Sequence, residues 1–419
     1  MKNLLKKIKT IWWMGKSFSA RYYYGNPSRK LKIIGVTGTN GKTTTATLLY
    51  KIAIALGYKA GLISTVETLI NGERINTISK IPTPGTTPDS ITLTRLFREM
   101  LDRGCEYVFM EVSSHALDQK RVAGVKFVGG IFTNLTHDHL DYHKNFFNYF
   151  GAKRKFFTML GKSAFALTNA DDKYGLKMIQ SIQAHQFTYG FEQDFDSVLF
   201  HGEIKKMDFE GLLLAFNKIE IKSKLLGKFN AYNLLAVWSA ASLLGFDMLK
   251  VKHVLANIIA PRGRFEHFMS QSGALVVVDY AHSPDALEKI LMAVQEIKKE
   301  GKIISVFGCG GDRDPFKRKI MGKIGATLSD TAIFTSDNPR NEDPEKIISE
   351  MQVGLFQEDL KKVKIISNRH EAILEATKLA QKGDIILCAG KGHEDYQEIG
   401  GVKHHFDDME ELKGALAKT

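Results

Sequence analysis

The stretch Val36-Thr37-Gly38-Thr39-Asn40-Gly41-Lys42-Thr43-Thr44 decides the fold of this chain. It follows the apolar run at residues 31–35 and precedes a run at 45–56 with the pattern of a helix. A strand that ends in a Gly-rich turn and continues as a helix is typical of a phosphate-binding loop, because the backbone N–H groups of the turn and the helix N-terminus face phosphate oxygens. Position 36 holds Val where the strict pattern has Gly, but the rest of the stretch predicts that this chain binds ATP.

Each polar residue of this loop has an expected role. Lys42 reaches the β- and γ-phosphates, and the Thr43 hydroxyl takes a position on Mg²⁺. The nucleotide contacts expected from the loop are Gly38, Thr39, Asn40, Gly41, Lys42, Thr43 and Thr44.

Composition indicates a globular protein of two or three domains, since the chain has 419 residues, 44% of them hydrophobic and 25% charged. The three cysteines are widely spaced, which predicts neither a disulfide framework nor a Cys-based zinc site and favours a reducing cytoplasm. The net charge of +12 has no nucleic-acid-binding signature beside it, so we expect no nucleic-acid partner. No apolar run reaches the roughly 20 residues that span a bilayer.

The pattern of residues 31–260 predicts an α/β domain with a mostly parallel sheet. Strands are expected at 32–36, 107–112 and 128–134, alternating with helices. Residues 185–226 interrupt the alternation with short alternating runs and a turn at 209–211, which indicate a small antiparallel appendage. A helix at 232–244 closes this central ATP-binding domain.

Pro and Gly near residues 260–264 mark a domain boundary. Beyond it, strands are expected at 274–279, 303–308, 331–335 and 385–388, with helical stretches between them. Residues 261–419 therefore predict a second, smaller domain with a dinucleotide-fold-like α/β architecture.

Residues 1–30 form a basic, aromatic N-terminal extension. Leu4, Leu5, Ile8, Ile11 and Trp12 fall at helical spacing, with lysines between them. Such a helix can lie on an anionic membrane surface, so residues 1–14 are a candidate for peripheral membrane contact. A helix that packs its apolar stripe on the following domain explains the pattern equally well.

Motifs beyond the phosphate-binding loop carry a resemblance to a known family. They lie at residues 86–89 (TTPD), 111–117 (EVSSHAL), 134–143 (NLTHDHLDYH), 263–266 (GRFE), 279–285 (DYAHSPD), 308–314 (GCGGDRD), 337–340 (DNPR) and 390–394 (GKGHE). With the loop, these motifs resemble the Mur ligases, which join an amino acid to a growing peptidoglycan peptide at the expense of ATP. Their order resembles the MurE-type members, which add the third residue of the stem peptide. The resemblance covers roughly residues 31–410.

The resemblance implies a reaction in which ATP phosphorylates a substrate carboxylate and an amine attacks the acyl phosphate. It implies Mg²⁺ held by Thr43 and Glu111, and a second Mg²⁺ held by Glu111 with His139. It also implies that Lys153 is carbamylated by CO₂, which turns a cation into a carboxylate near the metals. Lys42, Glu111, His139 and Lys153 are thereby the expected catalytic residues.

The resemblance also assigns residues to the other ligands. Contacts to adenine and ribose map to Asn233, Arg264 and Asp279; the last two lie beyond the domain boundary, so ATP would bridge two domains. An ordinary strand-end cap is the competing interpretation of Asp279. The residues expected to touch the muramoyl-dipeptide acceptor are Thr86, Thr87, Ser113, Gln119 and Arg121.

The added amino acid is implied to be meso-diaminopimelate. The motif at 337–340 is the version of this segment associated with that amino acid, and its second carboxylate can pair bidentately with a guanidinium, whereas Arg would repel the ammonium of lysine. Glu394 would pair with the distal ammonium. The residues that match the family here are Arg313, Asn338, Arg340, Gly390 and Glu394.

This chain departs from the family at its start, because about 30 residues precede the first strand where MurE-type enzymes carry a UDP-binding domain of typical small-domain size. The acceptor can therefore be UDP-linked muramoyl dipeptide or a related precursor, such as a lipid-linked one. Two other interpretations stay open: an amide ligase of the same fold acting on another acid, such as a polyglutamate, and a non-catalytic membrane-associated ATP-binding module. The family implies a monomer.

Overall fold

A computed structural model describes residues 13, 15–75, 86–136, 138–192 and 198–417 of this chain. The chain folds into two compact units. Unit 1 comprises residues up to 206, with 212–224 and 229–258, and unit 2 comprises residues 207–211, 225–228 and 259–419. The basic apolar stretch at residues 1–12 lies outside the described residues, as do His137 and residues 76–85. None of the helices in the described part of the chain is long and apolar enough to cross a membrane.

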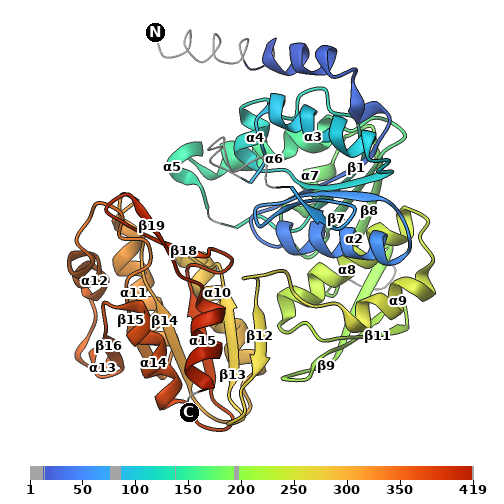
Figure 1. Cartoon of the computed structure of the whole chain (residues 1–419). Coiled ribbons are helices and arrows are strands. Elements are labelled where there is room, and N and C mark those ends of the chain that lie inside the picture. Colours follow the sequence, from blue (N-terminus) through green and yellow to red (C-terminus); the bar gives the residue numbers. More distant parts are fainter. Residues whose placement is uncertain (1–12, 14, 76–85, 137, 193–197, 418–419) are drawn as a thin grey trace. The chain divides into compact units, whose positions relative to one another are not determined.

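One sheet of 11 strands organises the first unit (Figure 1). Its order is β11-β10-β9-β8-β7-β6-β1-β5-β2-β3-β4, and β1, β2, β5, β6, β7 and β8 run parallel. The apolar runs read from the sequence are the central strands, buried on both faces as parallel strands are. The strands are β1 (Lys32–Thr37), β2 (Ala60–Ile63), β3 (Thr68–Ile70), β4 (Glu73–Arg74), β5 (Tyr107–Glu111), β6 (Phe127–Phe132), β7 (Phe165–Asn169), β8 (His185–Gly190), β9 (Phe200–Asp208), β10 (Gly211–Phe216) and β11 (Ile219–Ser223).

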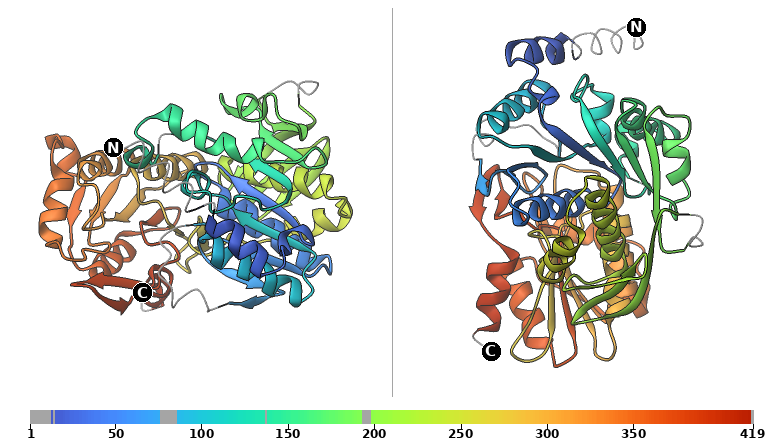
Figure 2. Two further views of the ribbon diagram at one scale, coloured as in Figure 1. Left: turned by 90° about the horizontal axis from the view of Figure 1, so that it is seen from above. Right: turned by 90° about the vertical axis from the view of Figure 1, so that its right-hand side faces the viewer.

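Helices cover both faces of this sheet, as the α/β pattern predicts. Figures 1 and 2 show α3, α4 and α6 on one side and α2 and α8 on the other. The first group contributes its apolar side chains to one continuous core with β1, β5 and β6. The helical elements are η1 (Pro27–Arg29), α2 (Lys42–Ala55), α3 (Ser90–Asp102), α4 (Ser114–Asp118), α5 (Leu140–His143), α6 (Phe146–Thr158), α7 (Gly175–Ile179), α8 (Lys228–Leu243) and α9 (Met248–Asn257).

The prediction of a small antiparallel appendage at residues 185–226 is wrong in part. β8 pairs in parallel with β7, and β9 begins in parallel with β8; antiparallel pairing is found between β10 and β11. All four strands continue the main sheet. Short alternating runs show that one face of a strand is buried, but they do not give the direction of the neighbouring strand.

Two helices begin earlier than the sequence pattern predicts. α2 begins at Lys42 rather than at residue 45, and Thr45 N donates to Gly41 O over 2.9 Å. α8 begins at Lys228 rather than at residue 232. In each case a glycine with positive φ precedes the helix, 81° at Gly41 and 87° at Gly227, so the chain turns directly into the first helical turn.

Unit 2 contains a six-stranded sheet with helices on both faces and a separate two-stranded sheet of β18 and β19. Its order is β12-β13-β17-β14-β15-β16, and all pairs are parallel except β12 with β13. α10, α11 and α12 pack on one face, and α14 and α15 on the other. The elements are β12 (Glu266–Met269), β13 (Leu275–Asp279), α10 (Pro284–Ile297), β14 (Ile303–Phe307), α11 (Phe316–Leu328), β15 (Thr331–Phe334), α12 (Pro344–Gln352), α13 (Gln357–Leu360), β16 (Val363–Ile365), α14 (Arg369–Leu379), β17 (Ile385–Ala389), β18 (Tyr396–Ile399), β19 (Val402–His405) and α15 (Asp408–Leu416).

Candidate active site

The glycine-rich loop lies between β1 and α2, and its glycines allow a close approach of neighbouring segments. A Cβ on Gly38 would lie 1.9 Å from Thr133 Oγ1, and one on Gly41 would lie 2.4 Å from Asn233 Oδ1. Val36, the departure from the strict pattern, is a fully buried strand residue between Glu111 and Ile131. The turn therefore begins after Val36, and no glycine is required there.

Lys42 folds back over the loop. Its Nζ donates to Gly38 O over 3.0 Å and to Thr39 O over 2.6 Å. The loop itself is held by Asn134, whose carbonyl accepts from Thr39 N and whose Oδ1 accepts from Asn40 N. This arrangement keeps the Lys42 ammonium next to the loop backbone, where it can bind a phosphate.

Lys153 on α6 shares the carbonyl that Lys42 uses. Its side chain is 1% exposed, its Nζ donates to Gly38 O over 2.6 Å, and its ammonium lies 4.7 Å from the centre of the Tyr149 ring. Burial, and then the nearby charge of Lys42, hold the pKa of Lys153 well below its usual range, and Asp138 partly opposes this. The Tyr149 hydroxyl in turn lies 3.1 Å from Thr39 Oγ1.

Glu111 ends β5 beside the loop, because its register partner in β1 is Val36. The side chain is 1% exposed, and it accepts from Thr65 N over 2.7 Å and from Thr65 Oγ1 over 3.1 Å. Thr43 is also buried, at the first turn of α2. A carboxylate and a hydroxyl at this end of a parallel sheet are oxygen ligands of the kind that Mg²⁺ prefers.

His139 lies in a cluster of rings. Its φ of 54° is left-handed, its Nε2 is 3.4 Å from Asp138 Oδ2, and its ring centre is 4.9 Å from that of His115. His143 lies 5.5 Å from His115 and 5.2 Å from Tyr149, centre to centre. Among the described residues, no group of three or more His, Cys, Asp or Glu side chains is arranged to hold a metal ion.

Four of the five residues expected to bind the acceptor are brought together. Thr87 Oγ1 donates to Glu111 O over 2.9 Å and accepts from Ser113 N over 3.0 Å. Arg121 donates from NH1 to Thr87 O over 2.7 Å, and from Nε to Gln119 Oε1 over 2.9 Å.

Asn233 is placed against the glycine-rich loop. It is buried on α8, its Nδ2 donates to Asn230 Oδ1 over 3.1 Å, and its Oδ1 faces Gly41. The two other residues assigned to the nucleotide lie in unit 2. Arg264 stacks on Tyr280 at 4.9 Å, and its Nε is buried with no hydrogen-bond partner among the described residues.

Asp279 has the geometry of a strand-end cap. It ends β13, and its Oδ2 accepts from Phe265 N over 2.8 Å. Burial raises the pKa of this carboxyl to about 6, and Arg264 and the backbone donors oppose the shift.

Unit 2 gathers the residues assigned to the amino acid around Gly310. A Cβ on Gly310 would lie 3.0 Å from Arg340 NH1 and 3.7 Å from Arg313 Cγ. Arg340 has a φ of 53°, donates to Gly311 O over 2.7 Å, and forms an ion pair with Glu398 at 3.2 Å. The two arginines therefore share one side of Gly310.

An amide–carboxylate pair completes this group. Asn338 Nδ2 donates to Glu394 Oε2 over 2.8 Å. Burial, followed by the charge of Asp337, raises the pKa of Glu394. Gly390 has a φ of 115°, and a Cβ there would lie 2.4 Å from Asp337 Oδ2, an oxygen that is buried without a hydrogen-bond partner among the described residues.

Some residues that hold the site side chains in place belong to no motif in the sequence. Thr65 holds Glu111 from 46 positions away, and Glu398 holds Arg340 from 58 positions away. Tyr149 is different, because it precedes Lys153 by four residues on α6, and residues four apart share a helix face. Helical spacing could therefore have identified Tyr149.

Comparison with known proteins shows the family to which this chain is similar. Residues 36–241 match the model of the Mur ligase middle domain, and residues 263–392 match that of the Mur ligase glutamate ligase domain. The chain is 53% identical over 395 residues to UDP-N-acetylmuramoyl-L-alanyl-D-glutamate--2,6-diaminopimelate ligase of Bacteroides thetaiotaomicron, covering 94% of this chain and 80% of the relative. It is 43% identical over 407 residues to the protein of the same name from Aquifex aeolicus, covering 96% of this chain and 80% of the relative.

Solved structures of other proteins are also similar to this chain. One of a UDP-N-acetylmuramoyl-L-alanyl-D-glutamate--2,6-diaminopimelate ligase matches with a TM-score of 0.66 and 34% identity, over 93% of this chain and 78% of that one. Folylpolyglutamate synthase of Mycobacterium tuberculosis matches with a TM-score of 0.72, over 90% of this chain and 92% of that one, but at 18% identity it shows the shared fold alone. This chain belongs to the Mur ligase family.

Proposed function

We propose that this chain is an ATP-dependent ligase that joins meso-diaminopimelate to the D-glutamate carboxylate of a muramoyl dipeptide in peptidoglycan synthesis. The observation that carries the proposal is the group in unit 2, where Arg313 and Arg340 lie on the same side of Gly310 and Asn338 pairs with Glu394. Diaminopimelate has a distal carboxylate and a distal ammonium, so guanidinium groups and a carboxylate provide one partner for each. The names of the relatives at 43–53% identity support the same substrate.

The test is ADP and phosphate release by the purified chain with UDP-muramoyl dipeptide and a panel of amino acids. We expect release, and a new amide product by mass spectrometry, with diaminopimelate. Release with lysine or glutamate but not with diaminopimelate would contradict the proposal, and so would the absence of amino-acid-dependent release.

The residues of the glycine-rich loop are proposed to bind the phosphates of ATP, with Lys42 facing the β- and γ-phosphates. Thr43 and Glu111 would hold Mg²⁺, with His139 at a second ion, and the metal would neutralise the charge that develops during phosphoryl transfer. Asn233, Arg264 and Asp279 are proposed nucleotide contacts. The buried Nε of Arg264, which has no hydrogen-bond partner among the described residues, supports this, because a ligand acceptor would satisfy it.

Lys153 is proposed to act as a carbamate. Only a neutral amine adds CO₂, and burial beside Lys42 favours the neutral form of Lys153. The neutral amine nitrogen bonds to the carbon of CO₂ and loses one proton to solvent, so an uncharged amine becomes a carbamate anion, which the ammonium of Lys42 attracts. A carbamate signal in ¹³C NMR after equilibration with ¹³C-bicarbonate, absent in Lys153→Ala, would support the modification; identical spectra would contradict it.

The residues proposed to bind the acceptor are Thr86, Thr87, Ser113, Gln119 and Arg121. Arg121 is held by Thr87 O and Gln119 Oε1, so its guanidinium is fixed before substrate arrives. A fixed guanidinium suits a substrate rich in carboxylates and amides, because less side-chain freedom is lost on binding.

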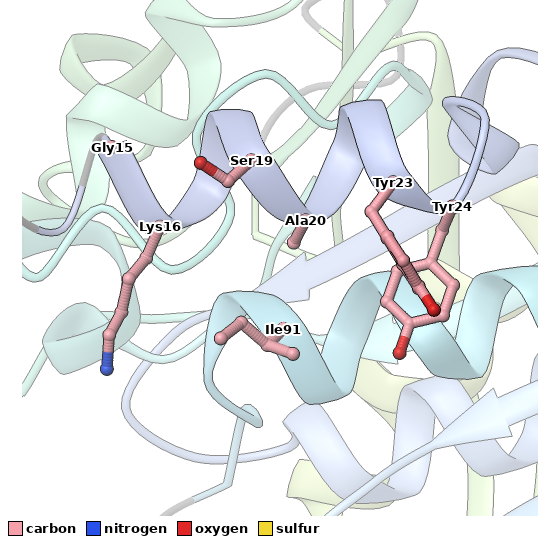
Figure 3. Close-up of a pocket in the computed structure, with 7 residues that line it drawn as sticks. All are labelled: Gly15, Lys16, Ser19, Ala20, Tyr23, Tyr24 and Ile91. Carbon is pink, nitrogen blue, oxygen red and sulfur yellow. The ribbon is translucent and has the colours of Figure 1, made fainter.

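We also propose that the N-terminal segment touches an anionic membrane surface, and that the enzyme is a cytoplasmic monomer. Residues 15–23 form a helix whose Ser17 and Ala20 are buried, while Phe18, Tyr22 and Tyr23 are 66%, 84% and 81% exposed. Figure 3 shows the groove that this helix forms with Ile91 of α3, a mostly apolar space of about 440 Å³. Exposed aromatic side chains that follow a lysine-rich stretch in the sequence are suited to a lipid headgroup layer.

A further inference from the structure

Lys391 is a buried cation to which the proposed reaction gives no role. It follows β17, its side chain is 0% exposed, and its Nζ lies 3.2 Å from Asn338 Oδ1 and 3.6 Å from Glu394 Oε2. Its ammonium also lies 5.5 Å from the ring centre of Tyr396. Burying an ammonium costs folding free energy unless polar or charged partners compensate its charge. Asn338 and Glu394 provide that compensation for Lys391.

The contacts of Lys391 determine how the amide of Asn338 is oriented. Asn338 Oδ1 accepts from Lys391 Nζ and also from Glu398 N over 2.9 Å. Two donors on one side of the amide require oxygen there, so the Nδ2 must point to the other side, where it donates to Glu394 Oε2. In the flipped amide, an N–H₂ group would face the Lys391 ammonium.

The charge of Lys391 also acts on Glu394. Burial and the neighbouring Asp337 both raise the pKa of Glu394, whereas Lys391 and the Asn338 amide lower it. The Tyr280 hydroxyl also lies 3.5 Å from this carboxylate, and the ring of Tyr396 packs on Lys391. Neither phenol supplies a positive charge in place of the ammonium.

We propose that Lys391 is a positioning residue for amino-acid selection, which holds Asn338 in one amide orientation and Glu394 in its ionised form for the distal ammonium of the incoming amino acid. It acts through these two side chains and does not touch the amino acid itself. This inference rests on the proposed function only for the identity of that amino acid. Any amino acid with a distal ammonium would depend on Lys391 in the same way.

Lys391→Met tests the proposal, with Lys391→Arg as the charge-retaining variant. In the Met variant we expect the KM for diaminopimelate to rise roughly tenfold or more, the size of effect of one charged hydrogen bond, with kcat and the KM for ATP little changed. Because loss of the cation raises the pKa of Glu394, the acidic limb of the kcat/KM profile for the amino acid should move to higher pH. Lys391→Arg should return the limb toward the wild-type position.

Lys403→Met is the matched control, since Lys403 packs on Tyr396 at 3.7 Å and is exposed on β19. It should leave the pH profile unchanged. An acidic limb that stays in place in Lys391→Met overturns the proposal, and so does an equal rise in the KM values for ATP and the amino acid with a lowered Tm, which shows a merely structural lysine. If wild-type enzyme uses another amino acid, the proposed function fails separately, and the same profile measured with that amino acid tests Lys391.

Discussion

The surroundings of Lys153 differ from those of an ordinary lysine, because it is buried beside a second cation. We predict that Lys153→Ala abolishes turnover, that high bicarbonate does not restore it, and that short carboxylic acids restore it partly by occupying the vacated space near the metals. Steady-state phosphate release measures all three. Lys155→Ala is the control, since Lys155 lies two residues away with its side chain 46% exposed and should retain activity. Wild-type turnover in Lys153→Ala would remove Lys153 from the site.

Arg340 carries the proposed choice between diaminopimelate and lysine. Its left-handed backbone and its bonds to Gly311 O and Glu398 fix the guanidinium beside Gly310. We predict that Arg340→Ala lowers kcat/KM for diaminopimelate about 10²-fold or more, because a desolvated carboxylate would lose its bidentate partner. Lysine, which lacks that carboxylate, should lose far less. An unchanged ratio of kcat/KM for the two amino acids would show that Arg340 does not select the substrate.

At the scale of helices and strands, the sequence predicts well those elements whose conformation depends on neighbouring residues in the chain. The glycine-rich loop and its strand are contiguous, and the apolar runs at β5, β13 and β17 identify buried strands within one or two residues. Contacts between distant segments are not predicted, because nothing local encodes them. The contact of Thr65 with Glu111 joins residues that are 46 positions apart. The contact of Lys391 with Asn338 joins residues that are 53 positions apart. The predicted antiparallel direction of β8 was wrong for a similar reason, because the pairing of β8 with β7 sets it.

One ion pair between α14 and α15 gives a prediction about stability. Arg369 Nε and NH2 donate to the two carboxylate oxygens of Asp408 over 2.8 and 2.7 Å, and both side chains are 0% exposed. Asp408→Ala would leave a buried guanidinium with an uncompensated charge. We expect the free energy of unfolding of unit 2 to fall by about 3–5 kcal/mol, measured by urea denaturation.

The partly exposed pair between Lys364 and Glu375 provides the comparison within the same unit. Glu375→Ala should cost about 1 kcal/mol or less, since solvent screens both charges. Equal losses from Asp408→Ala and Glu375→Ala would show that the buried pair does not support the packing of α14 on α15.

At the scale of the whole molecule, the proposed membrane contact depends on features spread over the N-terminal segment. The helix at residues 15–23 is tied to the rest of unit 1, because Ser17 Oγ donates to Lys120 O over 3.1 Å and Arg21 NH1 donates to Gly124 O over 3.0 Å. These contacts hold the outward aromatic side chains at a fixed place on unit 1. Removing the helix would disturb its packing, so substitutions on its outer face are the sharper test.

We predict that full-length protein co-sediments with vesicles containing anionic lipid, and that the triple variant Phe18→Ser, Tyr22→Ser, Tyr23→Ser loses most of this binding. Aromatic side chains enter the headgroup region, and each basic residue near the surface adds about 1 kcal/mol, so binding should also weaken as salt rises. Leu176→Ser, Leu199→Ser, Leu249→Ser is the matched control, because these side chains are 58%, 52% and 82% exposed elsewhere on unit 1. Equal, salt-independent sedimentation of all three proteins would leave the helix as a packing element, and the ligase would then meet its acceptor away from the membrane.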